Sequence, residues 1–286
     1  MHWRLVMVVL VAAVGSQTAR LAWSSEAFAP VERLPEVEHV ADSVAPTAST
    51  AFTPGQERRE RNRRERLIDR ATDPTAWLMQ YHFRDRWIVP TGDSGADQQE
   101  FQVRPTIPFL AWDQVNLFRA EIDYDIEIPS GSGLSEVRLF DLVVIEEAWG
   151  RWGVGPGVQL QPNSTSQDEF AVGPAAAAAC KSRHWTVGFI TESFFGNDLA
   201  ETYFEPILAY KFNDRWSLSA GEMKLRYDFR KGAWTQLPLG CSLDYISDLW
   251  GQKVRWFANP SFNFRDSSES EEWMLNFGLD LLAPDA

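Results

Sequence analysis

Apolar and polar side chains alternate with a period of two from about residue 76 to the end of the chain. In one segment Phe118, Ala120 and Ile122 are apolar, whereas the residues between them are charged. A period of two predicts an extended strand whose two faces differ. The pattern recurs in about twelve segments of about ten residues, separated by turn signals such as Asn213-Asp214. These segments are residues 77–84, 101–109, 118–128, 136–148, 150–161, 169–180, 184–195, 202–212, 215–229, 234–246, 252–265 and 271–282.

Three glycines spaced two apart lie in the segment RWGVGPGVQLQP. A dinucleotide-binding loop would need a helix directly after its glycines, and here the alternation of a strand continues instead. We therefore interpret the segment as a strand that is apolar on one face and lined with glycine on the other. The second face consists of Arg151, Gly153, Gly155, Gly157 and Gln159.

The ninth segment contains a change of phase. Apolar side chains occupy Trp216 and Leu218 and then, one position out of phase, Met223 and Leu225. Such a change predicts a β-bulge near Gly221.

The two faces of the predicted strands favour a membrane barrel over a soluble one. The apolar faces begin or end in aromatic residues, as expected at two lipid–water interfaces. The opposite faces carry charged, amide and glycine residues, which a polar lumen tolerates and a dry core would have to pair. We predict an all-β fold, a closed antiparallel up-and-down transmembrane β-barrel of about 12 strands preceded by a short charged helix. The aromatic positions are Trp77, Trp87, Trp152, Trp185, Phe204, Tyr210, Phe212, Trp216, Tyr245, Trp256, Phe264, Trp273 and Phe277.

Residues 1–29 are typical of a secretory signal peptide. Arg4 precedes an apolar run from Leu5 to Gly15 that is too short to span a bilayer as a helix. Cleavage after Ala29 fits the small-x-small rule, and cleavage after Ser24 is the alternative. Beyond this segment there is no run of about 18 or more apolar residues. We expect export to the cell outer membrane, with its lipid as a partner.

Residues 30–72 form a predicted periplasmic linker ahead of a barrel at 73–286. The linker begins as a Pro-, Ala-, Ser- and Thr-rich stretch without periodicity. Residues 57–70 then contain seven Arg and four acidic residues, with acid-first pairs four apart that favour a short helix. This arm is either a solvated spacer or a contact for anionic lipid, for cell-wall polymer or, as a plug, for the barrel's acidic interior. Its arginines include Arg58, Arg59, Arg61, Arg63, Arg64 and Arg66.

Composition narrows the function classes. The net charge of −13 argues against nucleic acid as a partner. His82 and His184 lie outside any recognisable serine or aspartate motif, so the sequence predicts no enzyme. Without clustered His or Cys at ligand spacing, it also predicts no metal and no cofactor. Cys180 and Cys241 are either one disulfide or two free thiols.

One predicted strand carries a row of acidic residues on its polar face. A row of carboxylates in a lumen favours cations, so we predict that these positions set charge preference. The alternative is that they only pair with basic residues of other strands and fill the lumen. The predicted selectivity residues are Arg119, Glu121, Asp123, Asp125 and Glu127, and the alternative partners are Lys211, Lys224, Arg226, Lys253 and Arg255.

Several segments occur in the order found in one group of bacterial proteins. They include DPTAWLMQYHF, WGVGPGVQLQP, FAVGPAAAAA and FEPILAYKFNDRWSLSA. Residues 71–284 thereby resemble the outer-membrane transporter-like barrels labelled neuromedin-U-like or phenol-degradation meta-pathway proteins. The resemblance implies a closed antiparallel barrel and passage of small molecules. The chain departs from the group ahead of Gly173-Pro174, where it lacks the usual Gly-Lys pair, so no shared ligand follows.

Three roles follow as hypotheses. The first is a passive or weakly selective channel or transporter for small solutes, based on the polar lumen. The second is uptake of apolar aromatic compounds, which only the family label suggests. The third is a plugged structural or anchoring barrel, in which the arginine-rich arm neutralises the lumen.

Overall fold

The computed structural model describes residues 67–90, 97–127, 132–162, 169–197, 199–264 and 272–283. Within these segments it contains one short helix, α3 (Leu67–Ala71), and strands that form a single sheet. The predicted signal peptide and the predicted linker up to residue 66, with all six arginines named above, lie outside the described residues. No helix in the described part of the chain is long and apolar enough to cross a bilayer.

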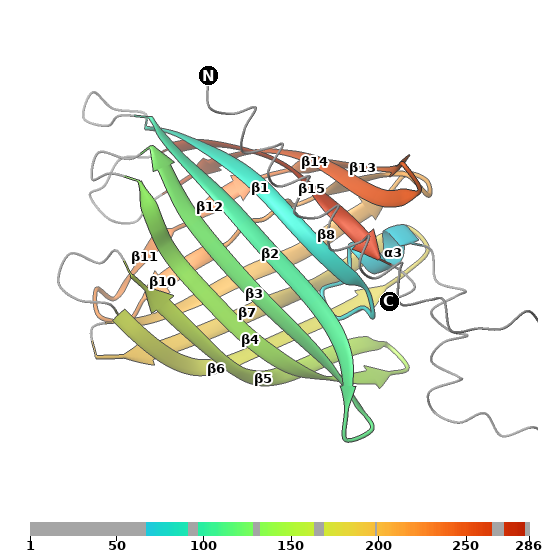
Figure 1. Ribbon diagram of the computed structural model, residues 1–286, viewed down its shortest axis with the longest axis horizontal. Helices are drawn as coiled ribbons and strands as arrows, with labels where there is room; N and C mark the ends of the chain where they lie inside the picture. Colours follow the sequence, from blue (N-terminus) through green and yellow to red (C-terminus); the bar gives the residue numbers. More distant parts are fainter. Residues whose placement is uncertain are drawn as a thin grey trace, which may run out of the picture. The chain divides into compact units, whose positions relative to one another are not determined.

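The fifteen β segments make twelve wall strands (Figure 1). Two wall strands are interrupted, because the ninth consists of β9 and β10 and the tenth of β11, β12 and β13. The bounds are β1 (Met79–Pro90), β2 (Gln98–Ala111), β3 (Gln114–Glu127), β4 (Gly133–Glu147), β5 (Gly150–Gln161), β6 (Glu169–Lys181), β7 (Trp185–Gly196), β8 (Ala200–Lys211), β9 (Trp216–Ser219), β10 (Leu225–Asp228), β11 (Ala233–Gln236), β12 (Pro238–Gly240), β13 (Ser242–Leu249), β14 (Gln252–Asn263) and β15 (Glu272–Ala283).

The sheet closes on itself. Each wall strand pairs antiparallel with the next along the chain, and β1 pairs with β15 from Met79–Ala283 to Pro90–Glu272. Closure satisfies the backbone groups that an open edge would leave unpaired. The predicted all-β, twelve-stranded, up-and-down barrel is therefore confirmed.

The two faces of the wall differ as the alternation predicts. In β3 the side chain of Glu121 points inward, and the residue is 1% exposed, whereas its neighbour Ile122 is 38% exposed on the outside. Trp112 and Trp250, in the two-residue turns after β2 and β13, are more than nine-tenths exposed. An outer surface of this composition suits lipid and its interfaces better than water. Cys180 and Cys241 are free and exposed, so the disulfide alternative is wrong.

One aromatic residue lies on the side opposite to the prediction. Trp77 precedes β1 and packs inside the barrel instead of on its outer surface. Its neighbours are apolar side chains that point inward from β3, β4, β6 and β7. This inner cluster consists of Val115, Leu117, Phe140, Leu142, Val144, Ala175, Ala177 and Ile190.

The glycine face of β5 points inward, as predicted. A Cβ atom on Gly157 would lie 3.0 Å from Cε1 of Phe194, so the missing side chain leaves room for that ring. A Cβ atom on Gly155 would overlap the carbonyl oxygen of Asp141 on β4. These glycines therefore allow a close approach of larger neighbours inside the barrel.

The predicted irregularity near Gly221 is confirmed. Between β9 and β10 the register against β8 shifts by one residue, from Ala209–Ser219 to Phe204–Leu225. Gly221 has a φ of 72°, a conformation that favours glycine. We call residues 220–224, which leave the strand here, the crossing segment.

The two ends of the barrel have connections of different length. The turns at 112–113, 148–149 and 250–251 contain two residues each, and the chain enters and leaves the barrel at that same end. At the other end the connections at 91–97 and 264–271 are longer. In bacterial barrels short turns face the periplasm and long loops face outward.

Candidate functional site

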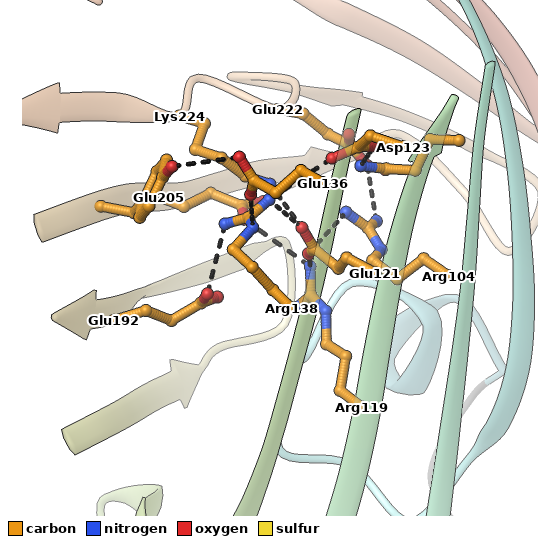
Figure 2. A network of polar contacts seen from close by, with 12 residues as sticks. Arg104, Arg119, Glu121, Asp123, Glu136, Arg138, Glu192, Glu205, Glu222 and Lys224 are labelled. Atoms are coloured by element: carbon orange, nitrogen blue, oxygen red, sulfur yellow. Dashed lines mark hydrogen bonds and ion pairs between the residues drawn. The ribbon is translucent and has the colours of Figure 1, made fainter. Parts of the chain in front are cut away.

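A layer of charged side chains fills the barrel interior (Figure 2). Its members come from β1, β2, β3, β4 and β7 and from the crossing segment, and their side chains are mostly buried. We call this group the charged layer. It consists of Arg84, Arg104, Arg119, Glu121, Asp123, Glu136, Arg138, Glu192, Glu222 and Lys224.

Glu121 on β3 is the centre of the charged layer. Its carboxylate lies 2.6 Å from Nη2 of Arg119, 2.6 Å from Nζ of Lys224 and 3.7 Å from Nη1 of Arg104. Arg138 donates a further hydrogen bond to it from β4. One carboxylate is thus shared among four cations.

The crossing segment contributes one acid and one base to the charged layer. Glu222 accepts hydrogen bonds from Arg84 and from Arg104, the latter at 2.5 Å. Lys224 donates to Glu121. These partners lie on β1, β2 and β3, whereas the crossing segment belongs to the ninth of the twelve wall strands. The ion pairs therefore link opposite sides of the wall across the lumen.

The charged layer leaves little solvent contact at this level. Arg84, Arg138 and Glu121 are each no more than 2% exposed. Buried ions cost several kcal/mol each unless opposite charges and hydrogen bonds compensate. Reciprocal ion pairs supply that compensation here. We conclude that paired charged side chains occupy the lumen at this layer.

The structure separates the predicted selectivity residues. Arg119, Glu121 and Asp123 belong to the charged layer, with Asp123 accepting a hydrogen bond from Gln102 at 2.5 Å. Asp125 is only half-buried, and the side chain of Glu127 lies outside the described part of the structure. Their role in charge preference stays a prediction.

The proposed cross-strand partners behave differently from one another. Lys224 pairs with Glu121, as the alternative interpretation expects. The other four basic residues pair with acids outside the acidic row. These pairs are Lys211 with Asp69, Arg226 with Glu201, Lys253 with Asp248 and Arg255 with Asp280.

Several central residues of the charged layer did not stand out in the sequence. Arg138 lies between Val137 and Leu139 in an ordinary alternation, so only its inward face could have been inferred. Glu222 follows Gly221 at the predicted bulge, where the inward or outward direction of a side chain is lost from the pattern. Ion pairs across the lumen join residues that are far apart in the sequence, so no local pattern of residues could predict them.

A second closure lies at the end of the barrel where the chain enters. We call residues 67–78 the N-terminal plug. Asp69 lies 2.6 Å from Nζ of Lys211, and Asp73 lies 2.7 Å from Nζ of Lys181. Arg151 contacts Asp73 as well, at 3.0 Å. The plug is therefore attached to β5, β6 and β8 by ion pairs inside the barrel.

Apolar contacts also hold the N-terminal plug. Ile68, Ala71 and Leu78 form a buried cluster with Ile246 and Leu282 of the wall. Trp77 adds its ring to the inner cluster described above. The predicted basic arm continues directly into this plug, but its residues up to Arg66 lie outside the described segments, so their role stays a prediction.

We expect the N-terminal plug to loosen in acid. Burial would raise the pKa of Asp73, but Lys181 and Arg151 outweigh burial and hold the pKa below its usual value. A depressed pKa stabilises the plug above the unfolded Asp value of about 3.9, and the stabilisation is lost as pH falls through the folded value. Trp77 fluorescence, obtained by subtracting the spectrum of Trp77→Phe, should therefore change below about pH 4.

Asp73→Asn is the matched variant for this titration. It removes the titrating carboxylate and should abolish most of the acid transition of Trp77. A transition with the same midpoint and amplitude in Asp73→Asn would contradict the assignment.

His82 on β1 lies between two carboxylates inside the barrel. Nδ1 is 2.6 Å from Asp280 and Nε2 is 3.2 Å from Glu222. The imidazole stacks on Phe257 with a centroid distance of 4.9 Å. His82 thus joins the crossing segment to β15.

A cavity of about 120 Å³ lies inside the barrel between the N-terminal plug and the charged layer. The plug contributes Ala71–Asp73 and Ala76 to its lining, and the charged layer contributes Arg104 and Glu222. The two closures are thus arranged in series along the lumen.

Comparison with known proteins shows no family for this chain. No protein-family model and no curated protein matches the chain. The KdgM porin is similar in structure, with 12% identity over 71% of this chain and 98% of that chain and a TM-score of 0.44. The NanC porin has 10% identity over 70% of this chain and 98% of that chain, with a TM-score of 0.44. Outer membrane phospholipase A from Escherichia coli has 12% identity over 71% of this chain and 95% of that chain, also with a TM-score of 0.44. Such scores carry no argument about function, and the family resemblance inferred from the sequence stays a prediction.

Proposed function

We propose that the chain is an outer-membrane barrel, closed at rest, that passes small polar solutes when the crossing segment leaves the charged layer. The observation that supports this most is the pairing of Glu222 and Lys224 with the opposite wall. A five-residue stretch held by ion pairs is a closure that can reverse without unfolding the wall. The solute itself is not specified by this geometry.

Location in a membrane is supported by the wall. The sheet closes through the pairing of β1 with β15, and large apolar side chains such as Val154, Val187 and Leu208 are exposed on the outside. A closed barrel with this outer surface satisfies the requirements of a lipid environment. The short turns then place the N-terminal plug at the periplasmic end.

The two other roles remain weaker proposals. A permanently plugged anchoring barrel is favoured by the combined ionic and apolar attachment of the N-terminal plug. Uptake of apolar aromatic compounds would have to use the inner apolar cluster around Trp77. His82 contacts the carboxylates of Asp280 and Glu222. That the chain is not an enzyme stays a prediction.

Solute flux into liposomes tests the closed-at-rest proposal. The wild-type barrel should admit a small neutral sugar slowly, at a rate above that of protein-free liposomes. The double variant Glu222→Gln/Lys224→Gln removes both charges of the crossing segment and should raise the flux several times. The matched control is Asp228→Asn/Lys231→Gln, which removes a pair at the barrel end in which Lys231 is exposed and Asp228 is partly exposed.

Each other outcome has a definite meaning. Rapid flux through the wild type would show an open porin and overturn the closed state. Flux at the protein-free level in both the wild type and the crossing-segment variant would favour the anchoring role. An equal rise in the control variant would mean that general loosening, and not the crossing segment, lets solute through.

A further inference from the structure

The cavity between the two closures has walls of two kinds. Toward the charged layer it is lined by Arg104 and Arg119. Elsewhere its lining includes the apolar residues Ile190, Ile207 and Phe257 together with acids such as Asp73, Glu205 and Asp244. A space lined by both charged and apolar residues suits an amphipathic small molecule.

Both arginines have unused donors. Arg104 is 7% exposed and Arg119 is 6% exposed, so neither can rely on bulk water. Within the described residues no hydrogen-bond acceptor meets Nη1 of Arg104 or Nε of Arg119. Leaving such buried donors unsatisfied is costly, and an acceptor in the cavity would remove that cost.

The carboxylates near these two arginines are shared with other cations. Glu121 is shared among four cations, and Glu222 is shared by Arg104, Arg84 and His82. A further acid is Glu205, whose carboxylate lies 3.8 Å from Nη2 of Arg119. A ligand carboxylate at this position would therefore compete with Glu205 for Arg119.

We propose that the cavity binds a small carboxylate with a short apolar tail. The carboxylate accepts hydrogen bonds from Arg104 and Arg119, and the tail lies against Ile190, Ile207 and Phe257. Arginine is well suited to carboxylates because its donors form a planar fork. A cavity of about 150 Å³ holds benzene, so this somewhat smaller one suits a compact ligand of roughly five to six non-hydrogen atoms.

Binding at equilibrium does not require the barrel to conduct. The inference adds a ligand class to the lumen and holds even if the wild type proves impermeable in the flux assay. Conversely, a barrel that passes sugar and binds no carboxylate would leave the proposed function intact.

Equilibrium dialysis of radiolabelled butyrate tests the proposal. The mature full-length barrel in lipid nanodiscs, at neutral pH and low salt, should bind butyrate saturably at one site. Unlabelled butyramide has nearly the same shape as butyrate but no charge. Butylammonium has a similar apolar chain but a positive charge. Neither should compete with butyrate, because the arginines recognise a carboxylate.

Two variants locate the site and one controls for net charge. Arg119→Gln should weaken butyrate binding about tenfold to a hundredfold, as for a lost charge-assisted hydrogen bond. Glu205→Gln removes the internal competitor for Arg119 and should strengthen binding. Lys253→Gln makes the same charge change as Arg119→Gln at a half-exposed pair with Asp248, and should leave binding unchanged.

Three results would overturn the proposal. Equal competition by butyramide would mean that the cavity recognises only apolar surface. A loss in Lys253→Gln as large as that in Arg119→Gln would mean that only net charge acts. Absence of saturable butyrate binding in both the wild type and Glu205→Gln would exclude the site. This result can be obtained whether or not Arg119→Gln folds.

Discussion

Replacing Glu121 by Gln should lower the free energy of unfolding of the barrel by about 3–5 kcal/mol, the usual cost of removing one partner from a buried ion pair. Glu121 is 1% exposed and faces Arg104, Arg119, Arg138 and Lys224. Glutamine keeps the volume and one acceptor but no charge. Four buried cations would then have lost the carboxylate they share. Urea unfolding in lipid vesicles, followed by tryptophan emission, gives the measurement.

A double-mutant cycle separates this electrostatic loss from a packing effect. Adding Lys224→Gln removes one of the cations left uncompensated, so the double variant should recover part of the stability, with a coupling energy of about 0.5–3 kcal/mol. Glu147→Gln makes the same charge change at the exposed end of β4 and should lie within about 0.5 kcal/mol of the wild type. A loss in Glu121→Gln no larger than in Glu147→Gln would show that the charged layer does not stabilise the fold.

Opening both closures together should raise single-channel conductance in a planar bilayer by more than the sum of the two separate increases. The N-terminal plug and the charged layer lie in series, with the cavity between them. Opening one closure alone already raises the current, but the closure left in place keeps it well below that of the fully opened barrel. The combined variant carries Glu222→Gln/Lys224→Gln and lacks residues 30–77, whereas each single variant carries one of these changes.

Deleting only residues 30–66 is the informative control. It removes Arg58–Arg66 and leaves the described N-terminal plug in place, so conductance should stay at the wild-type level. If this shorter deletion alone opened the barrel, the arginine-rich arm would be the plug. Strictly additive increases would show that the two closures do not act in series.

Local periodicity was enough to predict the wall. Each strand alternates because successive side chains point to opposite faces, so Glu121 and Ile122 could be assigned to different sides before any partner was known. The bulge at Gly221 could also be predicted from local sequence. One extra residue in a strand moves the following apolar side chains from odd to even positions, or the reverse. Strand number followed from counting turns between such segments.

The direction of Trp77 shows where local periodicity fails. Trp77 continues the alternation of β1 in the sequence, yet it precedes the first paired residue, Met79. Before Met79 the described chain has no strand pairing to keep its side chains alternating between the two faces, so it can turn inward. Asp73 is held in the lumen by Lys181 and Arg151, and Trp77 follows it onto the inner cluster.

The sequence by itself determined a closed barrel with an apolar outside and a polar inside, because those properties depend on neighbours in the chain. Only the tertiary structure decided which ion pairs occupy the inside. Glu121 and Lys224 are 103 residues apart, and Arg104 and Glu222 are 118 apart. Such pairs depend on closure and register around the whole wall, so the row of acids at 121–127 could not reveal which cations neutralise it.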